Sequence, residues 1–193
     1  TISREFGSGG REIGRRLAEA MKIAYYDQEI VAALIKRTKK AEEYVRYMEK
    51  ERPLPLLPIT TARTFGLPTN YAVTENLNFY MQESKIIQEV AEKSDCVIVG
   101  RCADYILKDN PNCINVFICA DRADRIKRIA ERYDVSEKKV LDRIKRMDRE
   151  RKYYYETHTG QEWGSISSHE ILLNASLLGI EGTVDILEGI YKR

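Results

Sequence analysis

The sequence predicts an α/β fold built on a mostly parallel sheet. Short apolar runs rich in β-branched residues predict buried strands at residues 96–99, 114–119 and 170–173, and residues 1–2 would end another strand. Stretches whose apolar residues recur at helical spacing separate these runs. Strands that alternate with helices form βαβ units, whose strands are parallel, so both observations indicate the same fold class.

Four helices are predicted from apolar stripes along the chain. Thr74 and Ser136 precede the second and third stripes as candidate N-caps, and Asp27 precedes a further short helix at residues 28–37. The stripes are formed by Ile13, Leu17 and Met21; by Leu77, Met81, Ser84, Ile87 and Ala91; by Val140, Leu141, Ile144 and Met147; and by Ile180, Val184, Leu187 and Tyr191.

Composition limits the classes of function. A net charge of +2 from 32 basic and 30 acidic residues argues against a protein that binds nucleic acid through its overall charge. No apolar run approaches the roughly 18–20 residues of a membrane span, and no signal-peptide pattern opens the sequence. Four cysteines without C-x-x-C spacing and two histidines predict no zinc site. We expect a cytoplasmic protein without nucleic-acid or membrane partners, and we leave oligomerisation open.

The length of 193 residues fits one domain, which the sequence divides into three regions. Four of the five prolines fall between residues 53 and 68, which predicts an inserted helical and proline-rich region over about 39–74. The core would then comprise 1–38, 75–135 and 165–193, and residues 136–164 would form a lid.

The strongest chemical signal is a glycine-rich loop at residues 3–14. It follows a strand end and leads directly into the first amphipathic helix. Glycines let the backbone turn its N–H groups towards an anion, and the helix N-terminus adds partial positive charge. The alternative is a tight turn without a ligand. We interpret the loop as an ATP-phosphate site formed by Gly7, Ser8, Gly9, Gly10, Arg11 and Glu12.

This loop differs from the G-x-x-x-x-G-K-[ST] pattern in either register. If Gly10 and Arg11 match the Gly-Lys pair, Glu5 replaces the first glycine and Glu12 replaces the Ser/Thr. If Gly7 and Gly9 match the inner glycines of a nucleotide-kinase loop, Gly10 falls on the lysine. Arg11 is the nearest substitute, because a guanidinium can grip phosphate oxygens with two donors. Magnesium would be held by Ser8, another residue or water.

An arginine-rich segment follows at residues 143–152. A cluster of guanidiniums could close over the phosphoryl groups, neutralise their charge and exclude water. The alternative is a solvated helix face laced with ion pairs to Asp148 and Glu150. We predict catalytic roles for Arg146, Arg149 and Arg151 in this lid.

Two further segments are candidates for binding the acceptor. Arg101 and Asp104 follow the strand at 96–99, and open α/β sheets bind ligands at the carboxyl ends of their strands. The alternative for this pair is a salt bridge at a helix N-terminus. Asp27 could orient an acceptor hydroxyl or act as its base, and equally could only cap the helix that follows it.

Taken together, these segments resemble the cytidylate kinase-like family of bacterial P-loop proteins. The resemblance extends from Thr1 to about Glu188 and is weakest across 40–72. It rests on S-R-E-F-G-S-G-G-R-E-I-G at 3–14, Y-Y-D-Q-E-I at 25–30, V-G-R-C-A-D-Y-I-L at 99–107, R-x-x-x-x-D-R-x-R at 143–151, T-G-x-x-W-G at 159–164 and L-N-A-S-L-L-G-I-E at 173–181.

The resemblance implies a three-layer α/β/α P-loop kinase-like fold with an acceptor-binding region and a lid. It also implies direct transfer of the γ-phosphoryl group of Mg·ATP to CMP, dCMP or a similar nucleoside monophosphate. By position, residues 7–11 would hold ATP phosphates, Asp27 and Arg101 would face the acceptor, and Arg146, Arg149 and Arg151 would serve the lid.

Two other functions remain open because the sequence departs from that pattern. The loop lacks the lysine, and Cys102 stands where cytidylate kinases carry an aspartate directly after the Gly-Arg pair, with Asp104 two positions later. The chain could phosphorylate another small hydroxyl-bearing acceptor. It could also be a non-catalytic nucleotide-binding sensor, which would bind ATP without transferring phosphate.

Overall fold

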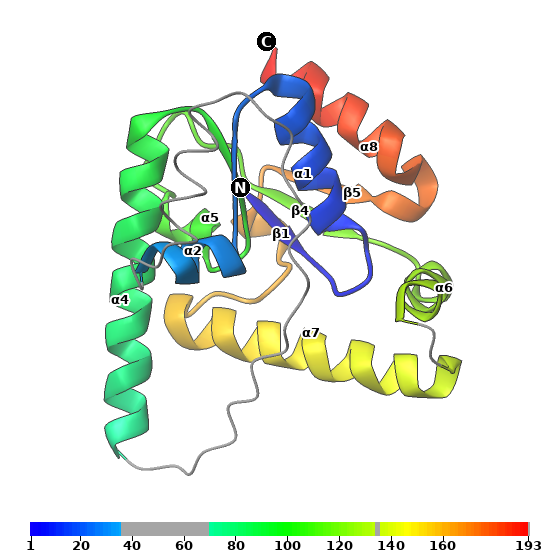
Figure 1. Cartoon of the computed structure of the whole chain (residues 1–193), viewed down its shortest axis with the longest axis horizontal. Coiled ribbons are helices and arrows are strands. Elements are labelled where there is room, and N and C mark those ends of the chain that lie inside the picture. The colour runs from blue at the N-terminus through cyan, green and yellow to red at the C-terminus, as the bar shows by residue number, and fades with distance from the viewer. Residues whose placement is uncertain (36–69, 134–135, 193) are drawn as a thin grey trace.

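The computed structural model describes residues 1–35, 70–133 and 136–192, and it contains a five-stranded parallel sheet (Figure 1). The proline-rich region predicted over 39–74 lies outside these ranges up to residue 69. The sheet order is β2-β3-β1-β4-β5. The strands are β1 (Ile2–Arg4), β2 (Ala24–Asp27), β3 (Cys96–Val99), β4 (Val116–Cys119) and β5 (Ile171–Asn174).

Helices cover both faces of this sheet. Helices α1 and α8 pack on one face, while α4 and α5 pack on the other, and α2 contributes Ile30 to the first cluster and Val31 to the second. The long helix α7 runs across one end of the molecule with α6 beside it (Figure 1). The bounds are α1 (Gly10–Met21), α2 (Gln28–Ile35), α4 (Asn70–Lys93), α5 (Ala103–Ile106), α6 (Arg122–Tyr133), α7 (Glu137–Thr159), the 3-10 turn η1 (Ile166–Ser168) and α8 (Ala175–Tyr191).

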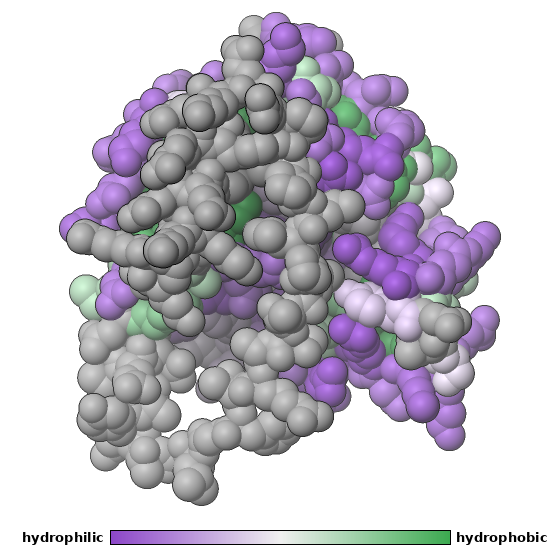
Figure 2. All heavy atoms as spheres, in the orientation of Figure 1, coloured by the Kyte–Doolittle hydropathy of each residue, from purple (hydrophilic) through white to green (hydrophobic). Residues whose placement is uncertain are grey.

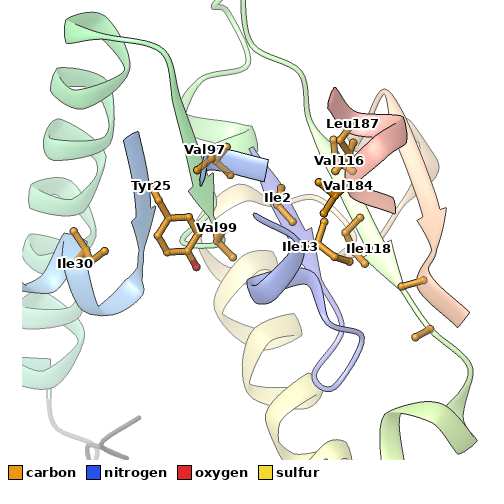
Figure 3. Packing of buried hydrophobic residues seen from close by; sticks show 13 residues of the cluster. Ile2, Ile13, Tyr25, Ile30, Val97, Val99, Val116, Ile118, Val184 and Leu187 are labelled. Carbon is orange, nitrogen blue, oxygen red and sulfur yellow. The ribbon is translucent and has the colours of Figure 1, made fainter. Parts of the chain in front are cut away.

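Strand β3, which lies between β2 and β1, shows why the fold has three layers. Val97 and Val99 belong to the same buried cluster as Ile13 of α1, which Figure 3 shows from close by. The residue between them, Ile98, belongs to the opposite cluster with Ile87 of α4. Successive side chains of a strand point to opposite faces, so a continuous apolar run serves two cores. The predicted α/β fold and its parallel sheet are confirmed.

The strand order creates a crevice between β1 and β3. These strands are neighbours, but the chain passes from β1 through α1 to the edge strand β2 before it returns through α4 to β3. Open α/β sheets bind ligands at such a reversal, outside the carboxyl ends of the strands. Here those ends lead into the glycine loop and into the turn at residues 100–102.

Three details of the secondary-structure prediction are wrong. Strand β2 was not predicted, because a four-residue strand with two tyrosines and a terminal Asp27 shows no apolar run. Thr74 is not an N-cap, because α4 already begins at Asn70 and no glycine or proline separates these residues. The stripe on α4 is displaced: Met81 is 62% exposed, whereas Glu83 is fully buried beside the expected Ile87.

The described surface carries both hydrophilic and apolar side chains. None of the described helices is long and apolar enough to cross a membrane. Figure 2 shows hydrophilic side chains around α6 and α7, with apolar ones appearing over α8, where Leu177 is 83% exposed.

Candidate functional site

The glycine loop is closed around Ser8. Gly7 and Gly9 have φ values of 85° and 92°, in the left-handed region that glycine adopts without a Cβ clash. The buried Ser8 hydroxyl donates to the carbonyl of Glu5 (3.0 Å) and accepts from the N–H of Gly10 (3.4 Å). The hydroxyl therefore braces the loop, and to ligate magnesium it would have to leave these bonds. The next N–H groups of α1, those of Arg11 and Glu12, have no acceptor within the helix and are available to an anion.

Two charged residues fix the loop to α6 and α7. The N–H of Phe6 donates to Asp148 Oδ1 (2.7 Å), and Arg125 Nε donates to the carbonyl of Phe6 (2.8 Å). Arg125 also forms ion pairs with Asp148 and with Glu5, the latter at 3.0 Å. The backbone that would meet the ATP phosphates is thus held in place before any ligand binds.

The structure brings only one of the three predicted lid arginines to this loop. Arg151 donates from Nη1 to the carbonyl of Arg4 (3.1 Å), and its guanidinium lies 5.4 Å from the ring centre of Phe6. Burial, and then the nearby Arg4, lower the pKa of Arg151. Arg146 is 66% exposed with Glu150 at 3.9 Å. Arg149 is also exposed, since residues 149 and 151 lie on opposite sides of a helix.

Arg11 points away from the loop towards β2 and α2. Its guanidinium lies 2.7 Å from Asp27 Oδ2 and 3.4 Å from Glu29. Asp27 Oδ1 accepts the N–H groups of Glu29 (3.0 Å) and Ile30 (3.2 Å), so Asp27 is the cap of α2 that the sequence allowed. Glu12 pairs with Arg16 on the outside of α1. Both oxygens of Asp27 are therefore already engaged.

The turn after β3 has an unusual backbone. Gly100, Arg101 and Cys102 have φ values of 78°, 60° and 55° in succession. A residue with a Cβ spends about 1–2 kcal/mol to adopt such a left-handed conformation, and such strain is concentrated at functional sites. The turn is joined to β1 by a bond from the N–H of Gly100 to the carbonyl of Ile2 (3.0 Å).

The side chain of Arg101 is held by two residues, Glu83 and Tyr154. It forms an ion pair with Glu83, which is fully buried on α4. The hydroxyl of Tyr154 on α7 donates to the same carboxylate (2.6 Å), and the Arg101 guanidinium lies 4.4 Å from the centre of the Tyr154 ring. Burial raises the pKa of Glu83, and the charge of Arg101 opposes that rise. The structure thus contains a salt bridge of Arg101, but its partner lies on another helix and not at the helix N-terminus that follows Arg101.

Asp104 does not face this crevice. Its side chain is 1% exposed and lies 3.3 Å from Nε2 of the fully buried His169. The other ring nitrogen, Nδ1, lies 3.0 Å from the carbonyl of Ser165. Nε2 and the Asp104 carboxylate are at ion-pair distance without a hydrogen bond of good geometry, and a neighbouring carboxylate favours the protonated, charged form of the ring. Asp104, which was predicted to contact an acceptor, contacts the buried His169 in this structure.

The His169–Asp104 pair predicts a pH-dependent stability. Burial lowers the pKa of His169, but its interactions with Asp104 and Ser165 outweigh that effect and raise the pKa above its ordinary value. The stabilisation is therefore complete below the unfolded pKa of about 6.5 and is lost as pH rises through the raised folded pKa. We expect the difference in melting temperature between the wild type and His169→Gln to shrink as pH rises from 5 to 9. A difference that is flat with pH would contradict the charged pair.

Several residues of the site were missed by sequence reasoning. Glu83, Arg125 and Asp148 are buried or half-buried charged groups whose partners are distant in sequence. The signal for Glu83 was its position four residues before Ile87 on the buried face of α4. Arg4 could have been recognised as a candidate site residue, because it is a charged residue at the carboxyl end of a buried strand.

Comparisons with known proteins agree with this architecture. The chain is 26% identical over 192 residues to a protein named cytidylate kinase from Methanosarcina acetivorans, covering 97% of this chain and 92% of the relative. A crystal structure of an uncharacterized protein from Eubacterium ventriosum is 28% identical, with a TM-score of 0.73 over 99% of this chain and 96% of that one.

Shikimate kinase from Bacteroides thetaiotaomicron is 15% identical and superposes with a TM-score of 0.54 over 100% of this chain and 96% of that chain, which shows that the chain has a P-loop kinase fold. A model of the cytidylate kinase-like family matches residues 1–177. The chain therefore belongs to the cytidylate kinase-like family.

Proposed function

We propose that the protein transfers the γ-phosphoryl group of Mg·ATP to CMP, dCMP or a similar nucleoside monophosphate. The observation that carries this proposal is the position of two loops at neighbouring strand ends. The glycine loop follows β1, and the Arg101 turn follows β3, with Gly100 bonded directly to β1. A donor phosphate on one loop and an acceptor phosphate on the other would meet in the crevice between them.

Each loop would have a separate task in this reaction. The N–H groups of the glycine loop and the first turn of α1 would hold the ATP phosphates. Arg101, with its guanidinium already oriented by Glu83 and Tyr154, would bind the acceptor phosphate. Catalysis would then be positioning and charge neutralisation, since phosphoryl transfer needs little covalent chemistry from the protein.

Magnesium would accompany the ATP. Within the described ranges no three His, Cys, Asp or Glu side chains gather into a metal cluster. Mg²⁺ usually keeps several waters and takes substrate phosphate oxygens as ligands, so it fits a site with few protein donors. When bound, it would neutralise charge on the phosphates.

A second candidate is a kinase for another small hydroxyl-bearing acceptor. Cys102, buried at 3% exposure, occupies the position of the family aspartate, and Asp104 is turned towards His169. Neither position offers a carboxylate to the crevice that could contact a cytosine base. This second candidate shares the donor site and differs only in the acceptor.

An acceptor screen separates the candidates. ADP release from Mg·ATP would be measured with each nucleoside monophosphate and with small hydroxy acids, using the exposed Arg132→Ala as a control. We expect CMP or dCMP to raise ADP release at least about tenfold over ATP alone, within the rate gain that positioning provides. Turnover with only a non-nucleotide acceptor would favour the second candidate. ATP binding without turnover would indicate a nucleotide sensor.

A further inference from the structure

Arg4 lies where the glycine loop lacks its lysine. A Cβ built on Gly10 would be 2.7 Å from the Cβ of Arg4 and 3.1 Å from its Cγ, so side chains at residues 4 and 10 would compete for one space. In G-x-x-x-x-G-K the first glycine precedes the lysine by six positions, and Arg4 precedes Gly10 by the same six. In this chain the cation, Arg4, stands at the position of the first glycine, and Gly10 stands at the position of the lysine.

The structure also decides between the two loop registers. Gly9 is the N-cap residue of α1 and Gly10 its first residue, which places the lysine position of the second register at the start of the helix. Arg11, which takes the lysine position in the first register, lies against Asp27 on the β2 side. Arg4 is thus the better-placed substitute for the missing cation.

The arginine extends from the donor loop to the acceptor turn. Its stem packs on Gly10, and its guanidinium lies against Gly100, where any Cβ would collide with Nη1. Asp27, Arg11 and Arg101 lie close enough to influence its pKa. Two glycines on separate strand ends therefore leave room for one guanidinium between the two loops.

Its electrostatic surroundings are those of a cation without a counter-ion. Across the described residues no carboxylate lies within ion-pair distance of Arg4, and its buried Nε has no hydrogen-bond partner. Arg151, which donates to the carbonyl of Arg4, likewise has no ion pair in these ranges. Burial is the largest influence on the pKa of Arg4 and lowers it. Buried charges are normally paired, so an anionic ligand would complete this arrangement.

We propose that Arg4 is the phosphate-binding cation of the glycine loop and contacts the terminal phosphate oxygens of the donor nucleotide in place of the lysine at position 10. This inference rests on the proposed ATP-dependent function. It assigns to the end of β1 a role that the usual loop gives to the start of the helix.

An exchange of the two residues tests the proposal. The variants are Arg4→Gly, Gly10→Lys and the double variant Arg4→Gly/Gly10→Lys, with Arg132→Ala as the control. We expect Arg4→Gly to lower turnover about 100- to 1000-fold, the range for removal of one preorganised donor. Gly10→Lys alone should also fail, because its Cβ collides with Arg4. The double variant should exceed either single variant by at least about tenfold, because it restores the G-x-x-x-x-G-K pattern.

Folding and ATP affinity are measured for the same four proteins. Melting temperature and circular dichroism identify any variant that fails to fold, and Arg4→Lys then replaces Arg4→Gly as a variant that keeps the charge but loses the forked donors. Unchanged turnover in Arg4→Gly, or a double variant no better than the singles, would overturn the role of Arg4. If the wild type binds ATP without turnover, the proposed function fails, and the same comparison of ATP affinities still judges Arg4. If the wild type binds no ATP, both proposals fail.

Discussion

Replacing Arg101 with alanine is expected to lower kcat/KM for the nucleoside monophosphate about 100- to 1000-fold, because a preorganised charged donor is removed from the acceptor phosphate. KM for ATP should change little, since Arg101 follows β3 rather than the glycine loop. Initial rates at varied acceptor and fixed saturating ATP would measure the effect.

The same substitution leaves Glu83 as a buried charge without its partner. Removal of one member of a buried ion pair typically costs about 3–5 kcal/mol of unfolding free energy, so low activity alone would be ambiguous. The double variant Arg101→Ala/Glu83→Gln resolves this, because a neutral amide can still accept the hydroxyl of Tyr154. We expect it to regain stability and remain inactive. Recovered activity in the double variant would limit Arg101 to a structural role.

Replacing Asp148 with alanine is expected to weaken ATP binding about 5- to 150-fold. The loop would lose the acceptor of the Phe6 N–H and one carboxylate partner of Arg125. A buried polar group without a partner costs about 1–3 kcal/mol. If this cost destabilises the ATP-binding conformation of the loop, it corresponds to the roughly 5- to 150-fold loss of ATP affinity. Isothermal titration with ATP would give the dissociation constants.

Two matched variants control for helix effects. Asp142→Ala removes an exposed carboxylate from the same helix α7 and should leave ATP affinity unchanged. Asp148→Asn keeps an acceptor for the Phe6 N–H but loses the charge that faces Arg125, so its affinity should be intermediate. An Asp148→Ala protein that binds ATP as tightly as the Asp142→Ala protein would show that this anchor does not support the loop.

The fold was predictable where the local structure permits only one kind of residue, such as apolar residues in a buried strand or glycine at a positive φ. Strand β3 is buried on both faces, so its sequence is a continuous apolar run that leaves little choice. Strand β2 ends in a capping aspartate and carries tyrosines, so its residues gave the signal of a helix start instead. The glycine loop was recognisable because its backbone geometry demands glycine at Gly7 and Gly9.

The side-chain partners could not be read from the sequence in the same way. Arg11 follows the glycines directly, but the rotation of α1 turns it towards Asp27, and that rotation depends on packing of Ile13 and Ala18 against the sheet. The pairing of Arg101 with Glu83 joins two elements that meet only after the chain has folded. A charge run likewise does not reveal which arginine of α7 faces inward.

Helix α7 touches both halves of the crevice with one continuous face. Asp148 and Arg151 contact the donor loop, and Tyr154 contacts the acceptor arginine, at spacings of three residues along one rod. A rigid helix cannot move at one contact and stay fixed at the other. If the proposed sites bind as inferred, occupancy of the donor loop and occupancy of the acceptor turn would be linked, and the free energy by which the nucleotide alters acceptor affinity would equal the free energy by which the acceptor alters nucleotide affinity.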